Sequence, residues 1–187
     1  MSECKSIAWL LLMVQMCPYE EGSDGELARA LLGVLHVTAD SFLGVAALTM
    51  LHLCRHGELQ LAPRCFRHLS MLAELSIRSC GLKAVPEAVL SGKGGTLWRL
   101  DLSHIYLGLS LPPECFNVLE ELKLVECGLR VFPAALSGVV GTLQRLDLSC
   151  NCNQAIDKAA SDILVAMPRL RWMCISGQSG YQDNDNK

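Results

Sequence analysis

The sequence predicts an α/β fold in which short parallel strands stack one after another into a right-handed solenoid. Three observations lead to this prediction. A short leucine pattern recurs along the chain, its copies follow one another at a nearly constant interval, and the apolar fraction of 51% includes only 5% aromatic residues. The core must therefore consist mainly of leucine, alanine and valine, which is how a solenoid of small aliphatic repeats uses its residues.

The leucine pattern is clearest in three segments. Leu72–Pro86 reads LAELSIRSCGLKAVP, Leu119–Pro133 reads LEELKLVECGLRVFP, and the segment from Leu143 reads LQRLDLSCN. Each has leucine or isoleucine three and five positions after the first leucine, and cysteine or asparagine eight positions after it. In this LxxLxLxx(N/C)xL pattern the chain resembles the leucine-rich repeat family, in its intracellular type with repeats of about 22–25 residues.

Six repeats can be placed, and the first and last match the pattern least well, as terminal repeats usually do. Successive repeats start at intervals of roughly 22–27 residues, within or near the range of this family. In the weaker copies His56, His104 and Gln178 are expected to stand where asparagine or cysteine otherwise occurs. The repeats begin at Leu48, Leu72, Leu97, Leu119, Leu143 and Leu170.

The resemblance implies a curved parallel sheet on the concave side and short helical or irregular segments on the convex side. Side chains alternate along a strand, so Leu122 and Leu124 are expected to face the core and Lys123 to face outward. Phe132 is expected to fill the core beyond the turn. The returning stretch 134–136 is short enough to form a single helical or 3₁₀ turn.

The chain divides into three parts on these grounds. Residues 48–176 form the predicted repeat array. Residues 177–187 are polar and rich in Gly, Asn and Asp, which predicts a disordered tail. Residues 1–47 precede the first clear repeat and are expected to form a mostly helical N-terminal cap, which covers the apolar end of the array.

The helical prediction for the cap depends on residues 24–47. Glu26–Leu35 (ELARALLGVL) has apolar residues at helical spacing, and Asp24 is available as an N-cap. A weak copy of the repeat pattern also begins at Leu32. It starts too close to Leu48 (48 − 32 = 16), because a repeat needs at least roughly 20 residues. A degraded repeat is therefore the alternative to a helical cap.

The apolar run Ile7–Val14 (IAWLLLMV) has two interpretations. A secretion signal is one, but Glu3 lies beside Lys5 ahead of the run, and no small-x-small cleavage site follows before Cys17. The run is too short to span a bilayer as a helix. A buried first helix or a degraded repeat is favoured, and the secretion signal stays open.

Four of the ten cysteines follow the repeat pattern. Cys80 and Cys127 occupy the position from which asparagine turns inward to satisfy backbone groups, and Cys65 and Cys115 lie in the matching segments LAPRCF and LPPECF. Cysteines tied to the repeat in this way are expected to be small buried side chains with free thiols. Free thiols in such number favour a reducing compartment, and hence a cytoplasmic location.

No cofactor, metal ion or catalytic residue is expected. In the segment 91–95 (SGKGG) Lys93 is followed by glycine, so a flexible turn between repeats is favoured over a Walker phosphate loop. Cys150 and Cys152 lack a second ligand pair for zinc, and the five histidines show no two-ligand spacing. The net charge of −3 without acidic or basic blocks indicates neither a nucleic-acid nor a membrane partner.

The remaining candidate site is the outward-facing side of the predicted strands. Thr49 is expected to begin this face on the first strand, and the central row is expected to run from His52 to Cys174. Trp98 and Trp172 flank the strands as possible aromatic anchors. The predicted protein-binding residues are His52, Ser76, Arg78, Arg99, Asp101, Lys123, Arg145, Asp147 and Trp172.

The resemblance implies a non-enzymatic interaction module that binds a protein or peptide on its concave strand face. The protein is expected to be a monomer. Asp101, Lys123 and Asp147 are expected to select the partner electrostatically. Two alternatives stay open: the sensing part of a larger receptor or signalling protein, and a regulatory subunit of an enzyme such as a phosphatase. A ubiquitin-ligase adaptor would need a docking helix pair within residues 5–45, which the sequence does not clearly contain.

Overall fold

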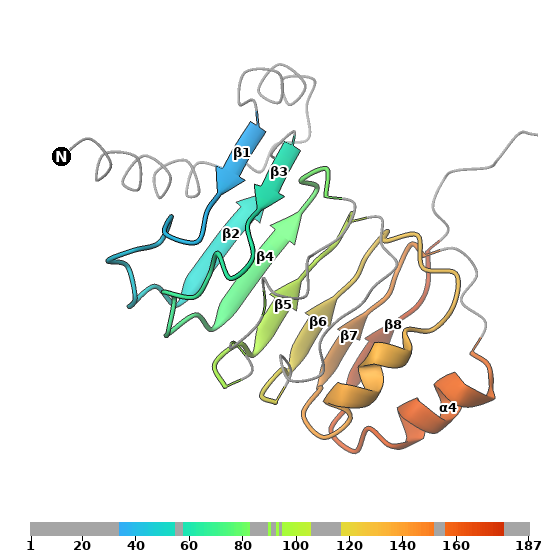
Figure 1. Ribbon diagram of the computed structural model, residues 1–187. Helices are drawn as coiled ribbons and strands as arrows, with labels where there is room; N and C mark the ends of the chain where they lie inside the picture. Colours follow the sequence, from blue (N-terminus) through green and yellow to red (C-terminus); the bar gives the residue numbers. More distant parts are fainter. Residues whose placement is uncertain are drawn as a thin grey trace, which may run out of the picture.

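The computed structural model describes residues 34–54, 58–82, 90, 93, 95–105, 117–151 and 156–177. These residues form an α/β structure with two parallel sheets (Figure 1). The main sheet consists of β2 (Met50–Cys54), β4 (Glu74–Arg78), β5 (Arg99–Asp101), β6 (Glu121–Lys123), β7 (Arg145–Asp147) and β8 (Trp172–Cys174).

The strands of the main sheet lie in the order β2-β4-β5-β6-β7-β8, and every neighbouring pair is parallel. Each of the six predicted repeats thus contributes one strand. The register aligns the first buried leucine of each strand, so that Leu75 lies beside Leu100, then Leu122, then Leu146. The prediction of a parallel α/β arrangement is confirmed.

The core lies on one face of the main sheet, because side chains alternate between the two faces of a strand. Leu100 and Leu102 are both fully buried, as are Leu122 and Leu124, whereas Lys123 between the latter two is half-exposed. Full burial of one such leucine contributes about 1.5–3 kcal/mol relative to an exposed position. Phe132 is also buried, as predicted.

A sharp turn ends four of the strands, and one residue in each turn adopts the left-handed backbone conformation. These residues are Ser79, His104, Glu126 and Cys150, with φ between 53° and 59°. The residue after each of them points into the core. His104 is therefore not the residue at the predicted asparagine position: Ile105 occupies it and is fully buried. The corresponding expectations for His56 and Gln178 lie outside the described residues.

The inward-pointing residues satisfy backbone groups at the strand ends. The Asn151 side-chain oxygen accepts from the backbone nitrogens of Cys127 (2.8 Å) and Leu129 (3.1 Å). Its side-chain nitrogen donates to the carbonyl oxygens of Leu124 (2.7 Å) and Leu148 (2.8 Å). A single buried side chain thereby joins two neighbouring turns of the chain.

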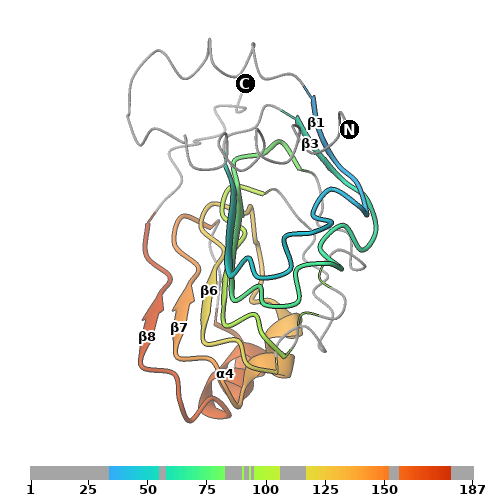
Figure 2. The same ribbon diagram turned by 90° about the vertical axis from the view of Figure 1, so that its left-hand side faces the viewer.

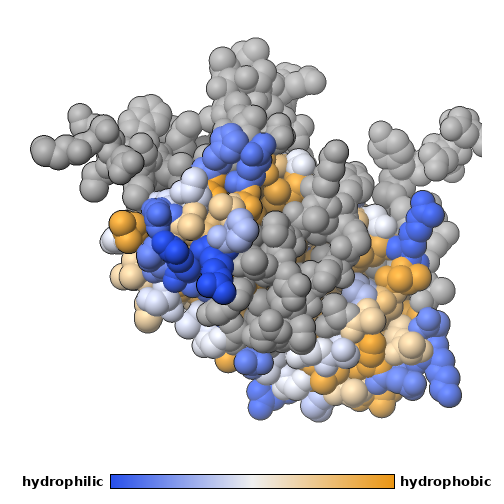
Figure 3. Space-filling view, in the orientation of Figure 1, coloured by the Kyte–Doolittle hydropathy of each residue, from blue (hydrophilic) through white to orange (hydrophobic). Residues whose placement is uncertain are grey.

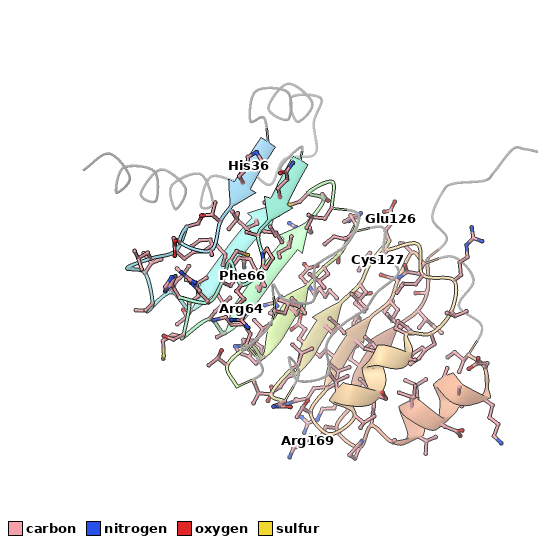
Figure 4. All side chains as sticks on the ribbon, in the orientation of Figure 1. His36, Arg64, Phe66, Glu126, Cys127 and Arg169 are labelled. Carbon is pink, nitrogen blue, oxygen red and sulfur yellow. The ribbon has the colours of Figure 1, made fainter. Side chains whose placement is uncertain are left out.

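Of the five cysteines whose side chains the structure describes, Cys65, Cys80 and Cys127 are buried as predicted, whereas Cys150 and Cys174 are half-buried. The Cys80 thiol donates to the Leu53 carbonyl at 2.8 Å, and the Cys127 thiol donates to the Leu102 carbonyl at 3.3 Å. Burial raises the pKa of the Cys65 thiol to about 12 and that of the Cys127 thiol to about 11. The side chains of Cys127 and its neighbour Glu126 lie in the turn that follows β6 (Figure 4).

The second sheet pairs β1 (Val34–Val37) with β3 (Glu58–Leu61). The starts of β1 and β3 are as far apart along the chain (58 − 34 = 24) as those of β2 and β4 (74 − 50 = 24). The chain therefore visits the two sheets alternately, in steps that match the repeat interval. The Phe42 and Phe66 rings, 5.8 Å apart between centroids, join the turns that follow β1 and β3.

The expectation of a mostly helical segment over 24–47 is wrong for the residues that the structure describes. Residues 34–37 form β1, and residues 38–47 form turns. Pairing with β3 and burial of Val37 stabilise the extended conformation that valine favours. The rest of segment 1–47, with the run Ile7–Val14, lies outside the described residues, as does the expected tail beyond Gly177.

Within the described ranges, two short helices lie on one side of the main sheet (Figures 1 and 2). The 3₁₀ helix η2 (Ala134–Val139) forms the predicted returning turn. Helix α4 (Lys158–Val165) begins at the N-cap Asp157, whose carboxylate accepts from the backbone nitrogen of Ala160 at 2.8 Å. The surface over η2 and α4 is a mixture of polar and apolar residues (Figure 3). The opposite face of the main sheet carries neither helix.

Candidate functional site

The main sheet presents two rows of side chains on the face opposite the buried leucines. We call this surface the open face. Each row contains one residue from each of the six strands, aligned by the register. The first row is Met50, Glu74, Arg99, Glu121, Arg145 and Trp172. The second row is His52, Ser76, Asp101, Lys123, Asp147 and Cys174.

All nine predicted binding residues lie on the open face. Eight belong to the two rows, and the ninth, Arg78, lies at the end of β4, where it pairs with Cys54 of β2. The second row is the central row that the sequence predicts. The expected place of Thr49 is wrong, because Met50 aligns with Glu74 and begins the first row. Thr49 instead accepts, through its carbonyl oxygen, from the backbone nitrogen of Glu74 at 2.9 Å.

A shallow hollow of about 210 Å³ lies on the open face over β2, β4, β5 and β6. Its volume is below the 300–1,000 Å³ typical of small-molecule sites. Charged and polar side chains dominate its lining, which suits a single side chain of a partner better than an apolar ligand. The hollow is lined by His52, Glu74, Leu75, Ser76, Arg78, Arg99, Asp101 and Lys123.

Charges alternate along the first row and neutralise one another. The Arg99 guanidinium lies 3.6 Å from the Glu74 carboxylate and 3.3 Å from that of Glu121. Glu121 also lies 3.5 Å from the Lys123 ammonium. All four side chains are partly exposed, so each pair contributes at most about 1 kcal/mol. The ion pairs hold these side chains in a fixed arrangement over the sheet.

Asp101 and Asp147 have a structural task in addition to any binding role. One Asp101 oxygen accepts from the backbone nitrogen of Ser103 at 3.0 Å. The equivalent Asp147 oxygen accepts from the backbone nitrogen of Ser149 at 3.1 Å and from its hydroxyl at 2.6 Å. Both carboxylates thus stabilise the turn after their strand, which explains why the sequence DLS occurs in both repeats.

The two candidate aromatic anchors differ in position. Trp172 lies in the first row and is 43% exposed. The Arg145 guanidinium lies 5.6 Å from the centroid of its ring, within the range of a cation–π interaction. Trp98 immediately precedes β5 and is 37% exposed. Trp172 is therefore the aromatic side chain that belongs to the open face.

Glu74 and Glu121 are the residues of the hollow and its rim that the sequence prediction did not count as binding residues. They hold Arg99 and Lys123 in place, so they determine the charge pattern that a partner meets. The alternation Glu, Arg, Glu, Arg at one position of four successive repeats is a signal that would have revealed them, because oppositely charged neighbours on adjacent strands attract.

Lys93 departs from the flexible surface turn that the sequence predicts. Its side chain is only 4% exposed, and its ammonium donates to the carbonyl oxygen of Leu69 at 2.6 Å. Removal from water lowers the pKa of Lys93. The backbone oxygen of Lys93 accepts from Thr96 and Leu97, which closes the turn ahead of β5. Lys93 thus belongs to the edge of the core and takes no part in the open face.

Within the described ranges, no group of three or more His, Cys, Asp or Glu side chains is arranged to hold a metal ion. Nor does the described part of the chain contain a helix with the length and apolarity needed to cross a bilayer. Comparison of the chain with protein-family models, curated proteins and solved structures found no match.

Proposed function

We propose that the chain is a leucine-rich repeat solenoid that serves as a non-enzymatic protein-interaction module. Its open face corresponds to the concave strand face of such a solenoid and binds another protein or a peptide. The observation that carries this proposal is the alignment of six parallel strands into two exposed rows over an array of buried leucines.

The polar hollow supports a protein partner rather than a small apolar ligand. Its lining contains three cations and two carboxylates beside the exposed His52. Lys123 contacts Glu121 of the first row and lies beside Asp101 in the register. A mixed charge pattern of this kind favours specificity over raw affinity. We propose a cytoplasmic location, because buried free thiols suit a reducing compartment. We also propose that the protein is a monomer.

Site-specific photo-crosslinking tests the proposal. A photoreactive residue replaces His52 or Lys123 on the open face, and in matched controls it replaces Val131 or Val165, which are 71% and 87% exposed outside the main sheet. In lysate of the source cells we expect the two open-face positions to cross-link the same protein and the two controls not to do so. Equal cross-linking from all four positions would exclude the open face as the binding surface.

Charge reversal provides the second arm of the test. Lys123→Glu brings a carboxylate beside Glu121 and Asp101 and should reduce the affinity for the cross-linked partner by about tenfold. Its circular dichroism spectrum and unfolding midpoint report whether the fold is intact. Unchanged partner affinity in a folded Lys123→Glu variant would refute the proposed role of Lys123.

A further inference from the structure

β8 forms one edge of the main sheet. It pairs with β7 on one side, and the described part of the chain supplies no strand on the other side. Figure 2 shows β8 as the outermost strand at the left of the sheet, with β7 and then β6 beside it. An edge strand presents a row of backbone donors and acceptors to any chain that can align with it.

The hydrogen-bond pattern identifies which backbone groups face this open edge. The Trp172 nitrogen donates to Gln144, and the carbonyl oxygens of Cys174 and Ser176 accept from the β7 side of the sheet. Alternate residues of a parallel strand bond to opposite neighbours. The N–H and C=O groups of Met173 and Ile175 therefore point away from β7, toward the open edge.

The side chains of β8 do not protect this edge. Lysine, proline or a bulge usually prevents an exposed edge from pairing with other chains, whereas residues 172–176 read WMCIS. Trp172 is 43% exposed and Ile175 is 42% exposed. Leu148 occupies the equivalent position after the neighbouring strand β7 and is 1% exposed. The row of apolar core side chains therefore ends at Ile175, which is exposed.

Three arginines lie around the beginning of β8. Arg169 and Arg171 precede the strand, and Arg145 lies beside Trp172. Figure 4 shows Arg169 at the lower edge of the molecule, where β7 and β8 begin. Among the described residues none of the three has an ion-pair partner, in contrast to Arg99, which lies between two carboxylates.

We propose that the open edge of β8 binds an extended segment of a partner protein, which adds to the main sheet as a further strand. Met173 and Ile175 supply the backbone hydrogen bonds, and acidic residues of the segment lie beside Arg145, Arg169 and Arg171. This binding mode uses a different surface from the hollow over β2, β4, β5 and β6, and it does not depend on the hollow being a binding site.

Charge complementarity favours a separate acidic partner over a second copy of this chain. Two copies related by a twofold axis would place residues 171–177 against residues 171–177 of the other copy. That segment reads RWMCISG and contains no acidic residue. A second copy could satisfy the backbone groups of the edge, but its strand would leave all three arginines of each copy without a carboxylate.

Fluorescence anisotropy with the full chain and three labelled synthetic heptapeptides tests the proposal. The first peptide has two glutamates followed by alternating valine and threonine, the second has two lysines in place of the glutamates, and the third has proline at its central valine. We expect the glutamate peptide to bind about three- to tenfold more tightly than the lysine peptide, since exposed ion pairs contribute modestly. The proline peptide should not bind, because proline cannot continue the ladder.

Backbone amide exchange locates the bound peptide. We expect the glutamate peptide to slow deuterium exchange at Met173 and Ile175 and to leave Lys123 unchanged. Slowed exchange at Lys123 with none at β8 would overturn the proposal, because the peptide would then occupy the open face.

Edge variants separate the backbone contribution from the charge contribution. Met173→Pro removes one outward donor, and Ile175→Lys adds a charge at the edge if the proline variant does not fold. Either should abolish peptide binding, whereas the control Val165→Lys, an equally apolar but remote exposed position, should bind normally. The double variant Arg169→Glu, Arg171→Glu should reverse the preference and bind the lysine peptide more tightly.

Three further results would overturn the proposal. None of the peptides binds, or the glutamate and lysine peptides bind equally to the unmodified chain. Alternatively, sedimentation velocity shows a dimer that Met173→Pro dissociates, in which case the occupant of the edge is a second copy.

Discussion

The side-chain nitrogen of Asn151 donates a 2.7 Å hydrogen bond to the carbonyl oxygen of Leu124, one strand away in the main sheet. The same side chain accepts from two backbone nitrogens of the turn between those strands. Neighbouring turns of this chain are therefore joined by side chain–backbone hydrogen bonds as well as by the strand ladder and leucine packing.

Replacement of Asn151 tests this connection. Asn151→Ala leaves two buried N–H groups and two buried carbonyls without their partner, so we expect it to lower the free energy of unfolding by about 2–4 kcal/mol. Asn151→Cys should cost less, because Cys127 performs the donor half of the same role in the preceding turn. Urea denaturation measures both. Equal losses for the two variants would contradict the role assigned to the thiol.

The buried thiols predict a loss of stability at alkaline pH. The pKa is about 12 for Cys65 and about 11 for Cys127 in the fold, against 9.0 in the unfolded chain. Because the pKa of each thiol is higher in the fold than in the unfolded chain, the two protonated thiols stabilise the fold. This contribution to the free energy of unfolding is complete below pH 9 and is lost as the pH rises toward 11–12. The loss amounts to at most about 1.4 kcal/mol per pH unit for each thiol.

A double variant isolates this effect from other groups that titrate in the same range. Cys65→Ala, Cys127→Ala should show a smaller decrease of the unfolding free energy between pH 8.5 and 10.5 than the unmodified chain. The two urea denaturation series are compared at each pH. Parallel pH dependences would show that these thiols do not ionise on unfolding.

For Lys93 we expect the opposite pH dependence, in which the free energy of unfolding increases as the pH rises. Burial lowers its pKa below the ordinary value of 10.5, so the folded state binds this proton less tightly than the unfolded state does. The resulting penalty is complete below the folded pKa and disappears as the pH rises toward 10.5. The unmodified chain should therefore gain stability relative to Lys93→Met between pH 7 and pH 10, measured by urea denaturation. A constant difference across this range would refute the prediction.

Replacement of Glu121 should lower the free energy of unfolding by an amount that depends on the salt concentration. Glu121→Gln removes the partner of both Arg99 and Lys123 and should lower the free energy of unfolding by about 0.5–1 kcal/mol at low salt. In 1 M NaCl the Debye length falls to about 3 Å, so the difference should largely vanish. Glu120→Gln, at the exposed neighbouring position without an ion pair among the described residues, is the matched control and should change stability little. A salt-independent loss would indicate a packing effect instead.

The periodic parts of the structure could be predicted from the sequence. Leu122, Leu124 and their equivalents are buried because the alternation within each strand and the repeat interval along the chain both place them inward. The same counting identified Asn151 and Cys127 as inward-pointing residues. It also aligned His52 to Cys174 as one row, because register on a stacked array follows directly from the repeat interval.

Features that depend on contacts between distant residues could not be predicted in this way. The segment containing Val34 has helical spacing upstream of it, yet it forms β1 because β3, one repeat interval later, provides a partner strand. The inward position of Ile105, by contrast, follows from the repeat pattern, because Ile105 lies eight positions after Leu97. Lys93 is buried because the carbonyl of Leu69 accepts from its ammonium.

The sequence by itself determined the repeat interval, the leucine positions of the core and all but the first residue of the two rows on the open face, since these follow from local alternation and period. Only the tertiary structure decided how those residues are used. Asp101 and Asp147 accept from the turns after their strands, Glu121 neutralises two cations, and three arginines near β8 have no described ion-pair partner. Such pairings depend on distances across strands, and a one-dimensional pattern contains no information about which of several nearby charges come within hydrogen-bonding range.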